Sequence, residues 1–283
     1  MLPRMGRLHT IFIALAAFVA VSSCATTQSV SQHDTREVQP PISALPPPVA
    51  PPPASPPLAL KLGRLQRQAP HLDPGVLALA LQAQQCAVRA GEVRADTRLA
   101  VIDYSLPSTS KRLWLFDLAN DRLLYHELVA HGQGSGDNYA TRFSNTENSH
   151  QTSLGLYRTA ETYTGGNGYS LRMDGLDPGF NDNARARAIV MHGAWYVDEG
   201  VIAKQGRIGR SHGCPALREG IAHTVINSLR ERQLVFAYAN DAAWLRSARS
   251  FSCGGETAQQ IIAQARQFAQ ARGGAIVASA VAP

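Results

Sequence analysis

Charged and aromatic side chains are scarce in this sequence of 283 residues. Charged residues account for 17% of the chain and aromatic residues for 7%, and its only lysines are Lys61, Lys111 and Lys204. Because 45% of the residues are hydrophobic, the composition is that of a globular protein rather than a disordered chain. The length is enough for one or two domains with a sizeable core.

The motifs of metal, nucleotide and nucleic-acid binding are absent. The histidines form no HExxH pattern, the cysteines form no paired CxxC spacing, and there is no phosphate-binding or dinucleotide fingerprint. The sequence therefore predicts no metal site and no cofactor. The net charge of +6 suits an anionic cell wall or membrane surface, but an ordinary basic protein has the same charge. Scattered basic residues without a recognition motif argue against a nucleic-acid partner.

The longest apolar run, Ile11 to Val21, is too short to span a bilayer and follows the basic residues Arg4 and Arg7. This pattern predicts a signal peptide. Residues 21–24, Val-Ser-Ser-Cys, resemble a lipobox, which predicts a lipoprotein-type signal peptide over 1–23 and a lipid anchor on Cys24. Ordinary cleavage after Ala25 is the alternative. With Ala25 after the cysteine, we expect export to the periplasmic side of a bacterial membrane, as an outer-membrane lipoprotein.

Residues 24–60 form a proline-rich tether, with ten of the seventeen prolines between Pro40 and Pro57. Such a segment adopts polyproline II without a core of its own and serves as a reach or as a passive spacer. After the tether, the hydrophobic periodicity predicts a helical segment over 61–98, a strand-rich domain over 99–241 and a helical tail over 242–283. We expect a mostly β domain with flanking α-helices, α+β overall.

Individual elements follow from capping and periodicity. Asp73 and Pro74 predict a helix start, and Gly91 predicts its end. Apolar runs and turn signals predict the remaining elements. Strands are expected over 99–103, 113–118, 123–129, 154–162, 188–197 and 234–238, and helices over 219–232 and 256–272.

The chemistry is concentrated in Gly209–Pro215, where Cys214 follows a Ser-His-Gly turn, and in the apolar segment that ends in His192-Gly193. A free thiol has a pKa of about 8.5 and is mostly protonated at neutral pH, so it needs a base to become a nucleophile. We interpret Cys214 as the nucleophile and His192 as the general base. A buried core cysteine and a structural histidine are the alternatives.

This arrangement resembles the L,D-transpeptidase (YkuD-like) family, which remodels peptidoglycan. The murein L,D-transpeptidase catalytic domain-like branch has a Gly-Arg-Ser-x-Gly-Cys-Pro-Ala loop, here Gly209–Ala216. Further blocks of that branch recur in order at 103–105, 130–132, 143–145, 153–155, 168–172 and 175–179. The better-known pattern has an arginine where this sequence has Ala216, and a shorter distance from His to Cys.

The resemblance implies roles for the neighbouring residues. The carbonyl of Gly193 would fix the tautomer of His192, and the amides of Gly213 and Cys214 would stabilise an oxyanion. The side chain of His212 contacts substrate or only shapes the loop, and Ser211 is expected to hydrogen-bond the loop or His192.

The remaining candidates concern substrate binding. Arg210 and, less strongly, Arg207 are expected to bind a substrate carboxylate, with solvated loop arginines as the alternative. Four residues of the matched blocks are interpreted as lining the cleft, although each is also typical of structure: His131, Asn145, Tyr169 and Asn183.

Two of the four cysteines, Cys86 and Cys253, have no role in anchoring or catalysis. In an oxidising periplasm they either pair in a disulfide or remain free thiols.

The resemblance implies acyl transfer on peptidoglycan stem peptides through a Cys214 thioester, and so L,D-transpeptidation. Hydrolysis of the same bonds and a non-catalytic wall-binding lipoprotein are the alternatives. The sequence leaves the oligomeric state open.

Overall fold

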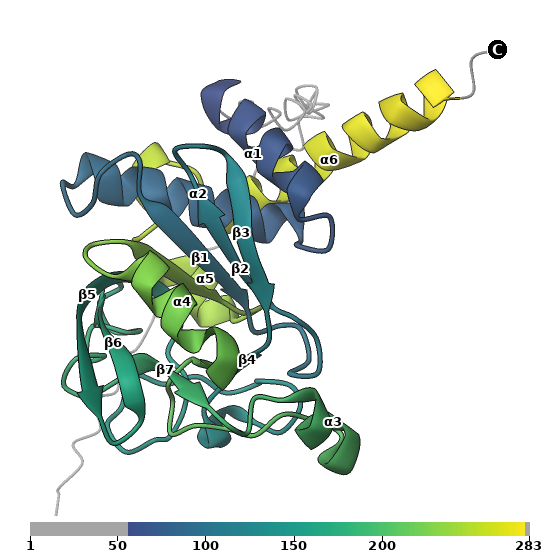
Figure 1. Ribbon diagram of the computed structural model, residues 1–283. Coiled ribbons are helices and arrows are strands. Elements are labelled where there is room, and N and C mark those ends of the chain that lie inside the picture. Colours follow the sequence, from purple (N-terminus) through teal and green to yellow (C-terminus); the bar gives the residue numbers. More distant parts are fainter. Residues whose placement is uncertain (1–55, 281–283) are drawn as a thin grey trace, which may run out of the picture. The chain divides into compact units, whose positions relative to one another are not determined.

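A nine-stranded sheet organises the part of the chain that the computed structural model describes, residues 56–280 (Figure 1). Its strand order is β3-β2-β1-β9-β5-β6-β7-β8-β4, in which β1 pairs with β9 and β7 with β8 in parallel and the other pairs are antiparallel. The strands are β1 Arg98–Asp103, β2 Leu113–Asp117, β3 Arg122–Glu127, β4 Val129–Ala130, β5 Gly155–Gly165, β6 Gly168–Gly175, β7 Val190–Ala194, β8 Ala216–Arg218 and β9 Leu234–Tyr238.

Six α-helices accompany the sheet in the described residues, together with two 3₁₀ turns. They are α1 Pro56–Gln68, α2 Pro74–Arg89, α3 Glu199–Gln205, α4 Glu219–Leu229, α5 Ala242–Ser247 and α6 Ala258–Ala280, with η1 Gln133–Ser135 and η2 Ser252–Gly254. The expected class, a β domain with flanking helices and α+β overall, is confirmed. The predicted start of α2 is also confirmed, because the Asp73 carboxylate accepts hydrogen bonds from the amides of Gly75 and Val76.

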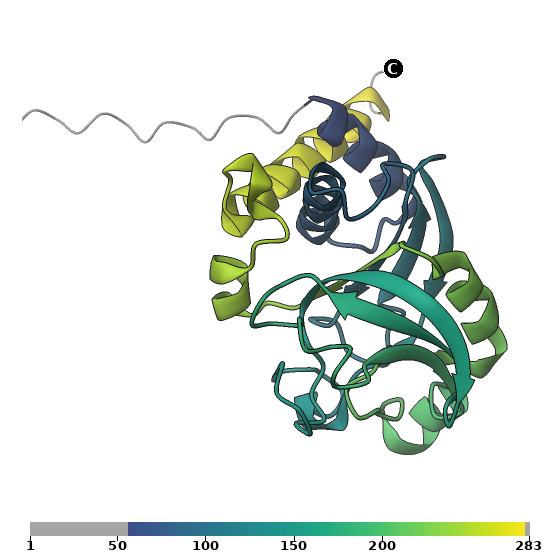
Figure 2. The ribbon, with the colours of Figure 1, turned by 90° about the vertical axis from the view of Figure 1, so that its left-hand side faces the viewer.

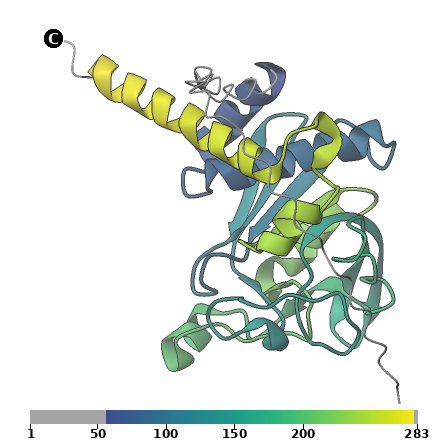
Figure 3. The same ribbon diagram turned by 180° about the vertical axis from the view of Figure 1, so that it is seen from behind.

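Helices α1, α2 and α6 form a helical layer beside β1, β2 and β3 (Figures 1 and 2). Helix α2 lies at its centre, and the side chains of Leu77, Leu79 and Leu81 are at most 1% exposed. Burying such a side chain stabilises the fold by about 1.5–3 kcal/mol. Seen from behind, α6 crosses this layer and its C-terminal end projects away from it (Figure 3). Hydrophobic burial therefore holds the layer to the sheet.

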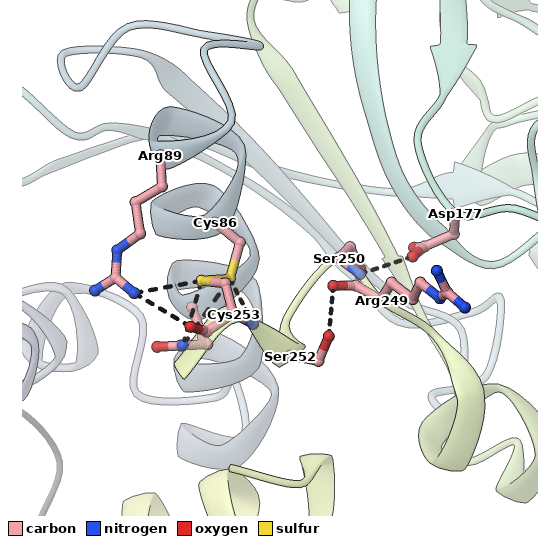
Figure 4. Close-up of a disulfide and its surroundings, with 8 residues drawn as sticks. Cys86, Arg89, Asp177, Arg249, Ser250, Ser252 and Cys253 are labelled. Atoms are coloured by element: carbon pink, nitrogen blue, oxygen red, sulfur yellow. Dashed lines mark hydrogen bonds between the residues drawn. A yellow bond between two sulfur atoms is a disulfide. The ribbon is translucent and has the colours of Figure 1, made fainter. Parts of the chain in front are cut away.

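A disulfide links helix α2 of the helical layer to the 3₁₀ turn η2 (Figure 4). Cys86 of α2 is bonded to Cys253 of η2, which lies 167 residues later in the chain. Of the two alternatives that the sequence left open for this pair, the structure contains the bridge.

The structure differs from the expected elements at several places. The proline-rich tether was expected to reach residue 60, but residues 56–60 already belong to α1. Proline is tolerated in a first helical turn, and the buried Leu58, Leu62 and Leu65 give this helix an apolar face. Elements α3, α5, β4, β6 and β8 were not predicted, because most are too short to show a period. The signal peptide, Cys24 and most of the tether lie outside the described residues.

No helix within residues 56–280 is long and apolar enough to cross a membrane.

Candidate active site

The catalytic pair proposed from the sequence lies at two adjacent parallel strands, with His192 within β7 and Cys214 just before β8. His192 is in β7 and is paired in register with Ala216 of β8. Cys214 stands just before β8, so the sheet places it beside β7, the strand that carries His192. Strand pairing thus places the two residues on neighbouring segments, although the long segment containing α3 separates them in sequence.

The orientation of His192 is fixed by its own backbone neighbour. Its Nδ1 lies 2.9 Å from the carbonyl oxygen of Gly193, and a carbonyl only accepts, so Nδ1 carries the proton. Nε2 is then the basic nitrogen. Burial lowers the pKa of His192, and the bond to Gly193 opposes this in part. The imidazole is therefore a neutral base at pH 7, in the tautomer that the resemblance implied.

The Cys214 thiol is buried, with the residue 8% exposed. Its Sγ accepts from the Val190 amide at 3.4 Å and lies 3.8 Å from the carbonyl oxygen of Ala188, in both cases backbone groups of the segment that leads into His192. Burial raises the pKa of the thiol, while the Val190 amide and the Arg187 charge act in the opposite direction. In the described residues the thiol thus bonds backbone groups rather than the imidazole, and the Cys214 and His192 side chains are both neutral.

The expected oxyanion donors differ in availability. The Gly213 amide donates to Ser211 Oγ at 3.1 Å, and Ser211 Oγ donates to the Cys214 carbonyl at 2.6 Å. The Gly213 amide is therefore used inside the turn, and its role as an oxyanion donor stays a prediction. The hydrogen bonds of residues 56–280 include none from the Cys214 amide, which remains available as a donor.

Gly213 is needed for the shape of the turn. Its φ is 120°, a conformation that side chains disfavour, and a Cβ there would lie 2.8 Å from the Gln151 carbonyl oxygen. Ser211 has the loop role that the sequence suggested, since it bonds Gly213 and Cys214.

A second segment, residues 131–133, contacts the loop Gly209–Pro215, called the cysteine loop below. Gly132 and Ser211 form a parallel bridge, in which Ser211 N donates to the His131 carbonyl at 3.0 Å and Gln133 N donates to the Ser211 carbonyl at 2.8 Å. Thr152 Oγ1 accepts from the Gly132 amide at 2.9 Å and contacts the Gly213 carbonyl at 3.4 Å. The loop therefore depends on residues far from it in sequence.

His131 has a structural role, because its buried ring is hydrogen-bonded to the buried side chain of Arg112. Both side chains are fully buried, and Arg112 Nη2 donates to His131 Nδ1 at 2.7 Å. Burial and the Arg112 charge lower the pKa of His131 to about 4, and burial lowers the pKa of Arg112 to about 10. At pH 7 the arginine is therefore charged and the histidine neutral. Sequence reasoning missed Arg112, which no motif marks.

Arg187 is a second residue that sequence reasoning missed. Its guanidinium donates to the carbonyls of Ser144 at 2.8 Å and Gln151 at 2.7 Å, and also to the hydroxyls of Ser149 and Ser153. It thereby braces the 144–153 loop while its charge lowers the thiol pKa. Its place just before the strand that carries His192 was the only signal in the sequence.

His212 lies exposed at the rim of the site. Its ring stacks on His150 with centroids 4.2 Å apart and planes 6° from parallel. Arg210 donates to the Gly136 carbonyl at 2.9 Å and to Asp137 at 2.8 Å, and Arg207 lies 3.9 Å from Asp137. Both arginine side chains therefore lie near Gly136 and Asp137, the residues that directly follow η1.

Tyr169 and Asn183, the remaining residues predicted to bind substrate, form hydrogen bonds with other parts of the protein. Tyr169 donates its hydroxyl to Asn227 of α4 at 2.7 Å. The Asn183 side chain donates to the Asn145 carbonyl at 3.1 Å, and its amide donates to the Asn145 side chain at 3.1 Å. These bonds join loops and elements, and a role of Tyr169 and Asn183 in substrate binding stays a prediction.

Within residues 56–280, no three His, Cys, Asp or Glu side chains are grouped so as to hold a metal ion.

Comparison with known families agrees with this architecture. The family model described as the L,D-transpeptidase catalytic domain matches residues 68–238, more than half of the chain. The chain therefore belongs to the L,D-transpeptidase catalytic domain family. The match begins at the end of α1 and so includes α2, which the sequence had placed outside the catalytic domain.

The solved structures that match this chain are distant from it in sequence. An L,D-transpeptidase from Mycobacterium smegmatis is 13% identical over 50% of this chain and 59% of its own, with a TM-score of 0.31. One from Mycobacterium tuberculosis H37Rv is 12% identical over 50% and 57%, with a TM-score of 0.30, and one from Stackebrandtia nassauensis is 14% identical over 58% and 68%, also with 0.30. The chain thus spans less than two thirds of the first two structures. No curated protein matches the chain.

Proposed function

We propose that this protein is a cysteine-dependent acyltransferase that acts on peptidoglycan stem peptides, as an L,D-transpeptidase. The observation that carries the proposal is the tautomer of His192. Gly193 holds its Nδ1 proton, and Nε2 is left as a neutral base on the strand beside Cys214. Membership of the L,D-transpeptidase catalytic domain family supplies the substrate class.

In the first half-reaction, His192 Nε2 takes the thiol proton and Cys214 Sγ attacks the carbonyl at the L-centre of the stem diamino acid. The Cys214 amide donates to the developing oxyanion, a contribution worth about 3–4 kcal/mol in comparable sites. The tetrahedral intermediate then breaks its C–N bond. The terminal D-amino acid leaves with the proton held by the imidazole, and a thioester remains on Cys214.

In the second half-reaction an amine of another stem attacks the thioester. The imidazole takes the amine proton and returns it to sulfur as the C–S bond breaks, so the thiol is regenerated and a new amide links the two stems. Attack by water gives a free carboxylate instead. The two outcomes share one acyl-enzyme and differ only in the acceptor.

The test is mass spectrometry of purified disaccharide tetrapeptides incubated with the protein, beside a Cys214→Ala control. We expect cross-linked dimers or exchange of the terminal D-amino acid, both absent in the control. Shortened monomers alone would assign the hydrolase activity. No change in either sample, together with a Cys214 thiol that carbapenems do not acylate, would contradict catalysis and favour a wall-binding role.

We also propose that the chain is exported and anchored through lipid on Cys24, which would place the enzyme on the periplasmic side of a bacterial membrane. The support is the n-region, apolar run and lipobox-like sequence before Cys24. Labelling of expressing cells with a palmitate analogue is expected to mark the wild-type chain but not a Cys24→Ala variant. Equal labelling of both would contradict the anchor.

A further inference from the structure

A pocket of about 420 Å³ opens beside the cysteine loop. Its walls come from the long segment between His192 and Cys214, and Gln133 of η1 completes it. Its lining includes the side chains of Gln133, Trp195, Tyr196, Lys204, Arg207 and Arg210. The volume is within the range of about 300–1,000 Å³ that is usual for sites of small ligands.

The pocket carries an excess of positive charge. Lys204, Arg207 and Arg210 line it. Asp137 pairs with Arg210 at 2.8 Å and approaches Arg207 at 3.9 Å, while its own side chain is 83% exposed. Among residues 56–280, no carboxylate lies within ion-pair distance of Lys204. Arg207 and Arg210 share one carboxylate and Lys204 has none, and the pocket therefore favours an anionic ligand.

Aromatic groups complete the pocket. Trp195 is 72% exposed, whereas the other two tryptophans, Trp114 and Trp244, are at most 1% exposed. Its indole contacts the ring of Tyr196 edge-on at 5.8 Å. Burial raises the pKa of Tyr196 to about 12, so the phenol stays neutral and remains a hydrogen-bond donor. An exposed indole next to cations offers an apolar face to a ligand that also carries anionic groups.

The cysteine loop forms part of the pocket wall. The Gly209 amide donates to the Tyr196 carbonyl at 2.8 Å, which joins the aromatic wall to the residues just before Cys214. Arg210 belongs to the pocket and to the same loop as Ser211 and Cys214, and it is tied to Gly136. A ligand in the pocket is thus held by the same loop that carries the thiol.

We propose that this pocket is a subsite for a carboxylate-bearing peptide, in which Lys204 and Arg207 bind the carboxylate and Trp195 covers the peptide chain. The inference rests on the proposed function, which makes the ligand a peptidoglycan stem. It adds a site outside the catalytic pair and assigns binding to Lys204 and Trp195, which no motif marks. Arginine binds a carboxylate through paired hydrogen bonds, and lysine adds a point charge.

The test is calorimetric titration of the full chain, purified in detergent, with a stem tetrapeptide and with the same peptide amidated at its carboxylates. We expect the free peptide to bind at least tenfold more tightly than the amidated one. Lys204→Gln and Arg207→Gln are each expected to weaken binding of the free peptide about tenfold, as for loss of a charge-assisted bond. Lys111→Gln, an exposed lysine that does not line the pocket, is the matched control and should change nothing.

Trp195 fluorescence tests whether the peptide binds in this pocket. The free peptide should change the emission of the wild type and of Cys214→Ala, and the change should be lost in Trp195→Phe. Equal affinity for the two peptides, no binding by the wild type, or an unaltered Lys204→Gln variant would overturn the subsite.

Failure of the proposed function has a different signature. The pocket would still bind the free peptide in the Lys204-dependent way, but no thioester would form on Cys214. Failure of the subsite alone would leave thioester formation intact while Lys204→Gln binds the peptide normally.

Discussion

The helical layer and the cysteine loop are stabilised in different ways. In the helical layer, apolar side chains such as Leu65 and Leu79 are fully buried, and the Cys86–Cys253 disulfide adds a covalent link. Around the cysteine loop the buried groups include Arg112, His131 and Ser211, and hydrogen bonds to backbone atoms hold them. Hydrophobic burial is non-directional, whereas each of these bonds requires one donor and one acceptor at fixed positions.

This difference predicts different tolerance to substitution. A packed apolar layer accepts another side chain of similar volume at a cost below about 1.5 kcal/mol. A buried polar network loses about 1–3 kcal/mol for every group left without a partner. Substitutions in the layer should therefore change stability alone, and substitutions behind the loop should change stability and activity together.

The largest effect is expected for Arg112→Met. The change leaves His131 Nδ1 and the carbonyls of Val129 and Leu106 without their buried donor. We expect a loss of about 3 kcal/mol or more in unfolding free energy and a fall in the rate of Cys214 acylation. Denaturant unfolding and acylation kinetics measure the two effects. The exposed Arg122→Met is the control, and an Arg112 variant with normal acylation would contradict a role in positioning the loop.

Leu79→Ala tests the helical layer. Its side chain is fully buried in α2, so the truncation should cost about 2–5 kcal/mol in unfolding free energy. Below the melting temperature, acylation of Cys214 should be unchanged, and Leu79→Met should cost less than about 1.5 kcal/mol. A slower acylation rate in folded Leu79→Ala protein would show that the two regions are coupled.

The disulfide gives a second test of the same region. Cys253→Ser should lower the unfolding free energy by about 2–5 kcal/mol, the usual cost of losing a native bridge. Thermal unfolding of the variant and of the wild type, each with and without reductant, measures this. Reductant should destabilise the wild type and leave the variant unchanged. An equal response of both proteins would show that the bridge does not contribute.

The smallest effect concerns the titration of the thiol in the cysteine loop. Because burial raises the Cys214 pKa and lowers that of His192, the resting pair is uncharged at pH 7. In the folded state the Cys214 thiol keeps its proton up to a pH above the ordinary thiol pKa. Only the thiolate is alkylated, so the alkylation rate should rise about tenfold per pH unit through neutral pH. Its inflection should lie above that of the unfolded chain. An iodoacetamide profile that is already flat below pH 7 would instead indicate a thiolate–imidazolium pair.

Several features of the molecule could be predicted from local sequence. The α2 cap is set by Asp73 and Pro74, and strand β9 is an apolar run that the structure reproduces as Leu234–Tyr238. The proposal that Cys214 and His192 act as a pair followed from residue types within two short motifs and stays a prediction. These signals extend over a few residues, and neighbours along the chain generate them.

Other features depended on partners distant in sequence. Strand β8 has three residues, and only its pairing with β7 and β4 makes it a strand. The Gly213 amide donates to Ser211 within the turn, and Arg112 gives His131 a supporting role.

The sequence by itself therefore determined the residue types of the proposed pair, the α+β class and the two cysteines available for a bridge. Only the tertiary structure decided which amides of the cysteine loop are hydrogen-bonded within it, which arginines brace the loop and where the basic pocket lies. The physical reason is the range of the interactions. Capping and hydrophobic period act between neighbours in the chain, whereas buried hydrogen bonds join residues that only the folded sheet brings together.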